Sequence, residues 1–237
     1  MKDKNQLKIL SRLHALADPA KLDGMAHFGM ATERRLGIPV PPIRALAKEI
    51  GTNQPLALEL WQTGIAEARI LATILADPHS ITPIQMDAWA ADLNSWDVCD
   101  HACGNLFDKT PYAWEKVRQW AAQEAQFTRR AGYALLACLA WHDKQAPDQN
   151  FIDAFPIIKA GAADPRNFVK KAVNWALRNI GKRNRALNAA AIKLARDIDR
   201  IDDKTAHWIA KDALRELTAE KTRARLKKKG EKSALKG

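Results

Sequence analysis

The sequence lacks the features that would point to export or to a membrane. Only three cysteines occur in 237 residues, Cys99, Cys103 and Cys138, and so small and odd a number is more typical of reduced cytosolic thiols than of a disulfide framework. The longest apolar stretch without a charge, residues 131–141, is far shorter than the roughly 20 residues that cross a bilayer. No apolar signal core follows the first residues. We therefore expect a cytoplasmic protein with no membrane contact.

Motifs of several enzyme classes are absent too. The sequence has no Gly-rich phosphate loop, no dinucleotide fingerprint and no nucleophile elbow. Cys99 and Cys103, with His101 between them, could be proposed as zinc ligands, but no Cys-x-x-Cys or His-Glu-x-x-His motif accompanies them. We expect no metal site and no cofactor, and we interpret these cysteines as buried core residues.

Strand patterns are also lacking, and what remains is helical. Ala and Leu dominate, and alternating apolar and polar runs rich in β-branched residues do not occur. A capping residue before proline marks several helix starts, because its side-chain oxygen can accept from first-turn amides and proline needs no N–H there. These starts are Asp18-Pro19, Thr82-Pro83, Thr110-Pro111 and Asp164-Pro165. The expected helices span 4–17, 19–30, 41–50, 54–62, 65–76, 83–93, 96–108, 111–122, 125–141, 149–160, 166–180, 184–198 and 203–217.

The expected helices form pairs from residue 54 onward. The second helices begin near residues 65, 96, 125, 166 and 203, a period of about 30 to 40 residues that is typical of HEAT-like repeats. This predicts an all-α fold, an α-α superhelix (solenoid) of HEAT-like repeats in a single domain over residues 1–219, with an irregular helical bundle as the alternative. Residues 220–237 show no apolar face, so we expect a basic, disordered tail.

Positive charge is concentrated in two blocks. The formal net charge is +11, yet residues 1–164 sum to −2, residues 165–200 to +8 and residues 220–237 to +6. Charge runs are often only solvated surface. Two basic blocks toward one end of the chain favour a surface that binds phosphates, so nucleic acid or another polyanion is the expected partner class.

A tryptophan and an acid share one expected helix face. Trp96 and Asp100 are four residues apart and therefore project from the same side, one turn apart. Asn94 or Ser95 is expected to cap this helix, and Asp97 lies in its first turn, where free amides favour a carboxylate. An apolar residue and an acid on one helix face commonly mark only the border between core and surface, and a functional site is the alternative.

A second expected helix combines a tryptophan with cations. The spacing i, i+4, i+7, i+11 places on one face Lys171, Trp175, Arg178 and Lys182. A separate apolar stripe can supply the buried face: Phe168, Ala172, Ala176 and Ile180. Trp175 is therefore not needed for the core, and a tryptophan among cations suits contact with DNA or RNA. The alternative is an indole shielded by the aliphatic stems of lysine and arginine.

A third helix carries Arg129 and Arg130, which the sequence alone would leave solvated. Each of the three segments falls in the second helix of a successive pair. In a solenoid such helices line one wall, which is commonly the binding surface. Trp96, Asp100, Arg130 and Trp175 are therefore expected to converge on one groove.

At these residues the chain resembles the AlkD-type DNA alkylation-repair glycosylases, and the similarity runs over most of its length. The shared elements are the Leu36-Gly37-Ile38-Pro39 turn before the helix of Arg44, Ser95-Trp96-Asp97-x-x-Asp100, the Arg130-Ala131 step and Lys171-Ala-x-x-Trp175-x-Leu-Arg178. The Trp-x-x-x-Asp motif followed by the Lys-Ala-x-x-Trp-x-Leu-Arg motif, at this spacing, is fairly specific.

The resemblance implies a horseshoe of HEAT-like repeats with a basic concave surface for double-stranded DNA. An open horseshoe can work as a monomer, which is the oligomeric state we expect. The resemblance also implies hydrolysis of the N-glycosidic bond of cationic alkylated purines such as 7-methylguanine and 3-methyladenine, while the lesion stays stacked. By position, Asp100 matches the catalytic carboxylate, Trp96 and Trp175 the aromatic walls around the lesion nucleotide, and Arg130 a backbone contact. A cleft tyrosine of the family aligns near Phe28, so its hydroxyl is missing here.

Chemistry agrees with these residue types. A ring-alkylated purine is already cationic and leaves without a general acid, so a carboxylate needs only to stabilise the sugar cation and orient water. No lysine adjoins Asp100 in the motif, so a lyase step is not indicated. The alternatives are a non-catalytic DNA-binding or damage-recognition protein, and a protein-interaction scaffold whose charge serves solubility. When bound to DNA, the protein would be associated with the nucleoid.

Overall fold

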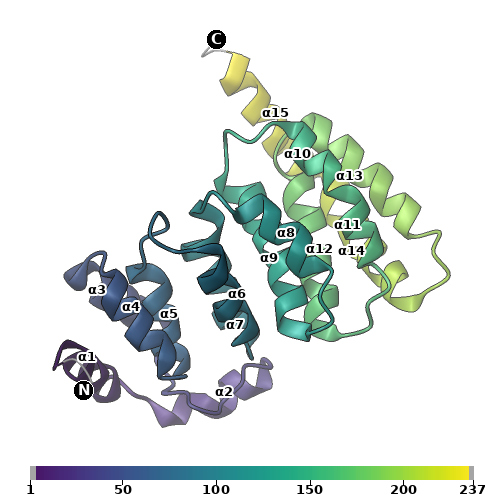
Figure 1. Ribbon diagram of the computed structural model, residues 1–237. Helices are drawn as coiled ribbons and strands as arrows, with labels where there is room; N and C mark the ends of the chain where they lie inside the picture. Colours follow the sequence, from purple (N-terminus) through teal and green to yellow (C-terminus); the bar gives the residue numbers. More distant parts are fainter. Residues whose placement is uncertain (1–3, 235–237) are drawn as a thin grey trace. The chain divides into compact units, whose positions relative to one another are not determined.

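The computed structural model describes residues 4–234, and every regular element in that range is a helix (Figure 1). The chain divides into two compact units, of which unit 1 ends at Ala113 and unit 2 begins at Trp114. The all-α fold is therefore confirmed. No helix in residues 4–234 combines the length and the apolar character needed to cross a bilayer.

Unit 1 contains seven α-helices within its described residues. These are α1 (Lys4–Ala15), α2 (Leu22–His27), α3 (Val40–Ile50), α4 (Gln54–Gln62), α5 (Ala66–Leu75), α6 (Pro83–Ala91) and α7 (Trp96–Asn105), with short 3-10 turns η1 (Pro19–Lys21) and η2 (Phe107–Lys109). In the core, the indoles of Trp61 and Trp89 stack with their ring centroids 4.1 Å apart and their planes nearly parallel. Helix α5 packs against α3, α4 and α7.

Unit 2 follows with helices that begin at the unit boundary. They are α8 (Ala113–Ala121), α9 (Gln126–His142), α10 (Asp148–Asp153), α11 (Phe155–Ala160), α12 (Asn167–Gly181), α13 (Arg185–Ile198), α14 (Lys204–Thr218) and α15 (Glu220–Ala234). Residues 130–140 of α9 are all buried, and α12 packs against α9, α13 and α14. The expected second helices of the repeats thus lie side by side within each unit: α5 beside α7, and α9, α12 and α14 in succession.

Most expected boundaries agree with the structure to within three residues, and the larger differences have local causes. The helix expected over 149–160 is two helices, because Pro156 cannot donate a backbone hydrogen bond and its ring obstructs a continuous helix. Thr82 caps α6 as expected, with its hydroxyl accepting from the Gln85 amide at 3.2 Å. Thr110 does not cap α8; its hydroxyl donates to the Phe107 carbonyl instead.

The C-terminal segment also differs from expectation. We expected a disordered tail over 220–237, whereas α15 continues to Ala234; residues 235–237 lie outside the described range. Leu226 is buried, and the Thr222 hydroxyl donates to the Glu216 carbonyl at 2.8 Å. One apolar side chain is too little to give a recognisable stripe in the sequence, yet it is enough to seat this helix against α13 and α14.

A buried carboxylate organises the chain before α3. Glu67, fully buried near the start of α5, accepts hydrogen bonds from the backbone amides of Leu36, Gly37 and Ile38 at 2.8–3.2 Å. Gly37 adopts a φ of 79°, and a Cβ there would lie 2.1 Å from the Asp18 carbonyl oxygen. Glu67 therefore fixes the course of the turn that the sequence carries as Leu36-Gly37-Ile38-Pro39.

The contact of α9 with α8 gives a test of the packing. A Cβ added to Gly132 would lie 2.4 Å from the backbone nitrogen of Ala121. We expect Gly132→Ala to lower the free energy of unfolding by about 1–3 kcal/mol, because backbone must move to relieve the clash. Gly24→Ala is the matched control, since nothing lies within 4 Å of its added Cβ. Urea unfolding followed by circular dichroism should show a loss for Gly132→Ala alone; equal stabilities would contradict the packing.

Candidate functional site

The start of α7 is held by a buried ion pair. The Arg35 guanidinium donates to both carboxylate oxygens of Asp97, at 2.8 and 2.9 Å, and the two side chains are only 2% and 10% exposed. The Ser95 hydroxyl donates to the same carboxylate at 2.5 Å and accepts from the Ala31 amide at 3.2 Å. Because the pair is bidentate and the Ser95 hydroxyl adds a third hydrogen bond to the carboxylate, the two buried charges neutralise one another.

This arrangement changes the interpretation of the first turn of α7. Ser95 occupies the N-cap position, but its hydroxyl makes no capping hydrogen bond to the helix amides. Asp97, expected to serve those amides, is instead the partner of Arg35. Sequence reasoning missed Arg35 because its partner lies 62 residues away and no local pattern links the two. The structural role expected for Asp97 is kept, with a different partner.

Phe28 and Trp96 are brought together through the backbone. The Trp96 indole N–H donates to the Phe28 carbonyl at 3.1 Å. The Phe28 ring, at the C-terminal end of α2, is 70% exposed. Three links therefore hold residues 28–35 against the start of α7: indole to carbonyl, amide to Ser95, and Arg35 to Asp97. Phe28, where the resemblance implies a cleft tyrosine, therefore lies beside Trp96, the first expected aromatic wall.

Asp100 lies one helical turn after Trp96 on α7 and is partly exposed. The next residue, His101, is mostly buried; burial first, and then the charge of Arg44, hold the pKa of its imidazole below the ordinary value, against a smaller opposing effect of Asp97. The imidazole is therefore neutral at pH 7. Asn105 joins this group, because its amide donates to Thr73 at 3.0 Å and its oxygen accepts from Arg44 at 3.4 Å.

The expected face of α12 is present in unit 2, but much of its charge is balanced. Lys171 is exposed and Trp175 is partly exposed. Arg178 pairs with Asp212 and Glu216 of α14, at 3.3 and 2.8 Å, and the Lys182 ammonium contacts Glu216 at 2.8 Å. The apolar stripe is buried at its three central and C-terminal positions: Ala172, Ala176 and Ile180. The net charge of residues 165–200 thus overstates the free positive charge of this face.

Glu216 owes its ionised state to these partners. Burial raises the pKa of Glu216, but the hydrogen bond and charge of Lys182 and the charge of Arg178 outweigh burial, so the pKa lies below its ordinary value. The carboxylate therefore stays charged well into the acid range and holds α14 to α12.

Arg130 is 4% exposed, and its guanidinium donates to the Phe168 carbonyl at 2.7 Å, which ties α9 to the start of α12. Its neighbour Arg129 pairs with Asp164 at 3.4 Å. The sequence alone would leave both arginines solvated, but in the structure each has a protein partner. Arg130 has a clear structural role, and its contact with a DNA backbone stays a prediction, as does the convergence of Trp96, Asp100 and Trp175.

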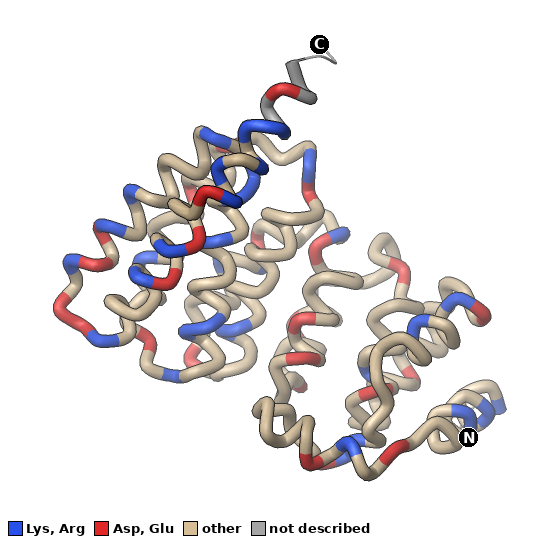
Figure 2. Tube along the Cα trace, turned by 180° about the vertical axis from the view of Figure 1, so that it is seen from behind, with Lys and Arg blue, Asp and Glu red and all other residues tan. Residues whose placement is uncertain are grey.

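Charge is unequal between the units. Residues 1–113 carry 11 Lys and Arg against 13 Asp and Glu, whereas residues 114–237 carry 27 against 14. Basic and acidic positions are interleaved along the helices of unit 2 (Figure 2). Unit 2 therefore holds the excess positive charge, while Asp100 lies in a slightly acidic unit.

The ion pair at the start of α7 predicts a large cost for its removal. Asp97→Asn leaves the buried Arg35 guanidinium without a counter-charge, and we expect a loss of about 3–5 kcal/mol in the free energy of unfolding. Glu33→Gln, at an exposed position between α2 and α3, is the control and should change the free energy of unfolding by less than about 0.5 kcal/mol. Chemical denaturation measures both; similar values for the two variants would refute the role of the pair.

The ion pairs of Glu216 on α14 with Arg178 and Lys182 at the end of α12 predict that stability depends on pH. Because the pKa of Glu216 in the folded protein is below the ordinary value of about 4.3, its contribution to stability is complete above that value and is lost as the pH falls through the folded pKa. At pH 7 we expect the free energy of unfolding of wild type to exceed that of Glu216→Gln by about 1 kcal/mol. Unfolding measured at several pH values should show this difference vanish in acid. A difference that stays constant with pH would contradict the stabilising role of these ion pairs.

Comparisons with known proteins agree with this architecture. A model of the family described as "DNA alkylation repair enzyme" matches residues 9–217. A solved structure described as "A new family of proteins related to the HEAT-like repeat DNA glycosylases with affinity for branched DNA structures" is similar, with a TM-score of 0.74 and 21% identity over 92% of this chain and 94% of that one. Among curated proteins, none matches in sequence. The likeness shows that the all-α fold is one of HEAT-like repeats, and the family match shows that the chain belongs to the DNA alkylation repair enzymes.

Proposed function

We propose that the protein is a monofunctional DNA glycosylase, which hydrolyses the N-glycosidic bond of cationic alkylated purines of the 7-methylguanine and 3-methyladenine type in duplex DNA. One observation carries the proposal: a partly exposed carboxylate, Asp100, follows Trp96 by one turn on α7, a helix whose start is fixed by the Arg35–Asp97 pair. In a member of the DNA alkylation repair family, such a rigid acid–indole pair has a direct chemical use.

The reaction needs little from the enzyme at the leaving group. An alkylated purine carries a positive charge, so the bond between C1′ and the base nitrogen breaks with its electron pair going to the base and no proton to supply. Positive charge then develops on the deoxyribose. The Asp100 carboxylate stabilises that charge and orients a water molecule, whose oxygen bonds to C1′ while its proton passes to the carboxylate or to solvent.

Aromatic side chains support the same step. An indole face beside a developing cation contributes on the order of 0.5 to 2 kcal/mol, and it also excludes water, which strengthens the electrostatic effect of the carboxylate. Trp96 supplies one such face, with its orientation fixed by its hydrogen bond to Phe28. Trp175 is the proposed second face. Phe28, itself exposed, is proposed to contact the DNA where relatives carry a tyrosine.

The excess positive charge of unit 2 supports the proposal that a monomer binds duplex DNA. Lys171 is exposed and available to a phosphate. Arg178 and Lys182 contribute through charges that Glu216 and Asp212 partly balance. DNA affinity should therefore fall with salt less steeply than the formal charge suggests.

Base release tests the proposal. Asp100→Asn keeps the shape of the side chain and removes its charge, so we expect release of 7-methylguanine from alkylated duplex DNA to fall by about 10²–10³-fold, with little change in DNA affinity. The control is Asp87→Asn, which removes an exposed carboxylate of the same unit and should release base at the wild-type rate. Mass spectrometry of the released bases measures the rates.

A non-catalytic DNA-binding protein is the second candidate, favoured by the affinity for branched DNA in the description of the similar solved structure. In that case wild type binds DNA in a salt-dependent manner and releases no base, or Asp100→Asn releases base as fast as wild type. Either result would overturn the glycosylase proposal.

A further inference from the structure

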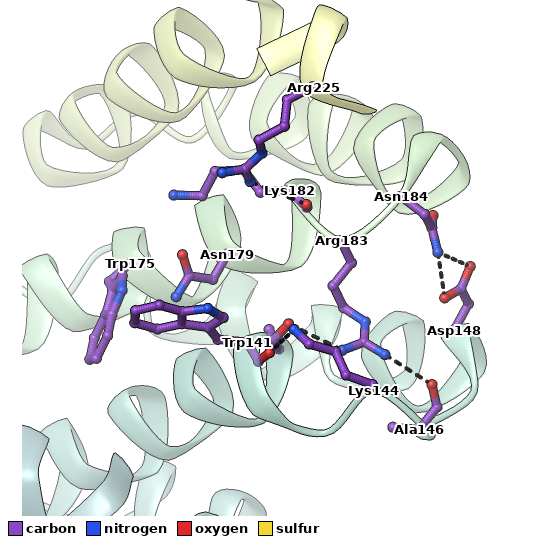
Figure 3. A pocket seen from close by; sticks show the side chains of 11 residues that line it. Trp141, Lys144, Ala146, Asp148, Trp175, Asn179, Lys182, Arg183, Asn184 and Arg225 are labelled. Carbon is purple, nitrogen blue, oxygen red and sulfur yellow. Dashed lines mark hydrogen bonds between the residues drawn. The ribbon is translucent and has the colours of Figure 1, made fainter. Parts of the chain in front are cut away.

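Unit 2 contains a pocket, and of its lining side chains the proposed chemistry uses only Trp175. Its volume is about 910 Å³, and it lies where the end of α9, the end of α12 and the start of α15 meet (Figure 3). The side chains that matter here are Trp141, Lys144, Trp175, Arg183 and Arg225. All of them belong to one unit, so the pocket is formed by unit 2 alone.

The pocket is cationic, because four of its lining side chains are basic and only one, Asp148, is acidic. Asp148 accepts two hydrogen bonds from the Asn184 amide, at 2.8 and 2.9 Å. Arg183 donates to the backbone carbonyls of Ala140, Asp143 and Ala146, which orient its guanidinium without neutralising it. These carbonyl contacts fix one positive charge in the pocket wall.

Two exposed cations stand beside this fixed charge. The Arg225 guanidinium reaches the Lys182 carbonyl at 3.5 Å, so α15 contributes a cation to the pocket. The Lys144 ammonium donates to the Trp141 carbonyl and keeps two further protons for other acceptors. Partial desolvation, followed by the charges of Arg183 and Arg225, lowers the pKa of Lys144. The cations therefore repel one another, and an anion bound among them would relieve that repulsion.

An aromatic surface adjoins the cations. Trp141 is 63% exposed, an unusual position for so large an apolar side chain, and its ring stacks on that of His142 with centroids 5.3 Å apart. Figure 3 shows the indoles of Trp141 and Trp175 at the same end of the pocket. A flat ring beside a cluster of cations matches the two parts of a nucleotide, its base and its phosphate.

We propose that this pocket binds an unpaired nucleotide of a DNA strand, with its base stacked on Trp141 and its phosphate held by Lys144 and Arg225. A volume near 910 Å³ exceeds what a free phosphate fills and is within the range of pockets that enclose a small organic ligand. The proposal goes beyond base release: it needs neither Asp100 nor an alkylated base, and it predicts a preference for DNA with an unpaired nucleotide over intact duplex.

The test compares three unmodified DNA duplexes by fluorescence anisotropy with the full chain. One is fully paired, one carries a single-nucleotide bulge, and one carries the same bulge with a tetrahydrofuran in place of the nucleoside. We expect wild type to bind the base-bearing bulge about tenfold more tightly than the tetrahydrofuran bulge, the usual effect of one stacked base. Trp141→Ala should remove that difference and leave the affinity for fully paired duplex within about twofold.

Matched controls separate stacking from general effects. Trp208→Ala, at another exposed indole of unit 2, should keep the preference for the base-bearing bulge. Lys144→Gln and Arg225→Gln should weaken binding of both bulges, whereas Lys193→Gln, at an exposed position outside the pocket, should not. Equal affinity of wild type for the two bulges, or a preference that survives Trp141→Ala, would overturn the proposal that the pocket binds an unpaired nucleotide. Neither result bears on base release, so the two proposals fail separately.

Discussion

Two buried carboxylates of unit 1, Asp97 and Glu67, fix the connection between α2 and α3. Most of the hydrogen-bond donors that they need come from this one short segment. Asp97 binds the Arg35 guanidinium and Glu67 binds the amides of residues 36–38, so both acids hold the connection between α2 and α3. A buried carboxylate without such donors would cost several kcal/mol, which makes these contacts obligatory. The position of Phe28 and the orientation of the Trp96 indole follow from that connection.

This constraint separates two neighbouring acids on one helix. Asp97 is buried and committed to Arg35, whereas Asp100, three residues later, is partly exposed on the helix whose start that pair holds. A catalytic carboxylate is most effective when its surroundings are already arranged before the charge develops. The buried pair supplies that rigidity, and the partly exposed acid is the one proposed to meet the substrate.

Net charge is a coarse guide to where free positive charge lies. The basic block around Trp175 includes Arg178 and Lys182, both of which pair with acids of α14. By contrast, Lys144 lies outside the two basic blocks and belongs to a pocket whose cations repel one another. The distribution of compensating acids, rather than the sum of charges, decides which cations a phosphate can reach.

Local patterns predicted the helices, and distant contacts decided most of what the sequence missed. Helix α6 begins at the residue expected for it, because Thr82 caps its first turn and Pro83 occupies its first position. The shared face of Trp175 and Arg178 likewise follows from helical spacing. The pairing of Arg178 with Glu216 does not, since it depends on how α14 packs against α12. The pairing of Arg35 with Asp97 likewise depends on packing between distant segments. So does the position of α15, which packs against α13 and α14 through the buried Leu226.

The proposed role of Asp100 is tested most directly by the affinity for a mimic of the sugar cation. Duplex DNA that carries a cationic pyrrolidine in place of one nucleotide is compared with duplex that carries a neutral tetrahydrofuran there. Wild type should prefer the cation by at least about tenfold, which corresponds to about 1.4 kcal/mol, and Asp100→Asn should bind both equally. Equal binding of the two duplexes by wild type would contradict electrostatic stabilisation by Asp100.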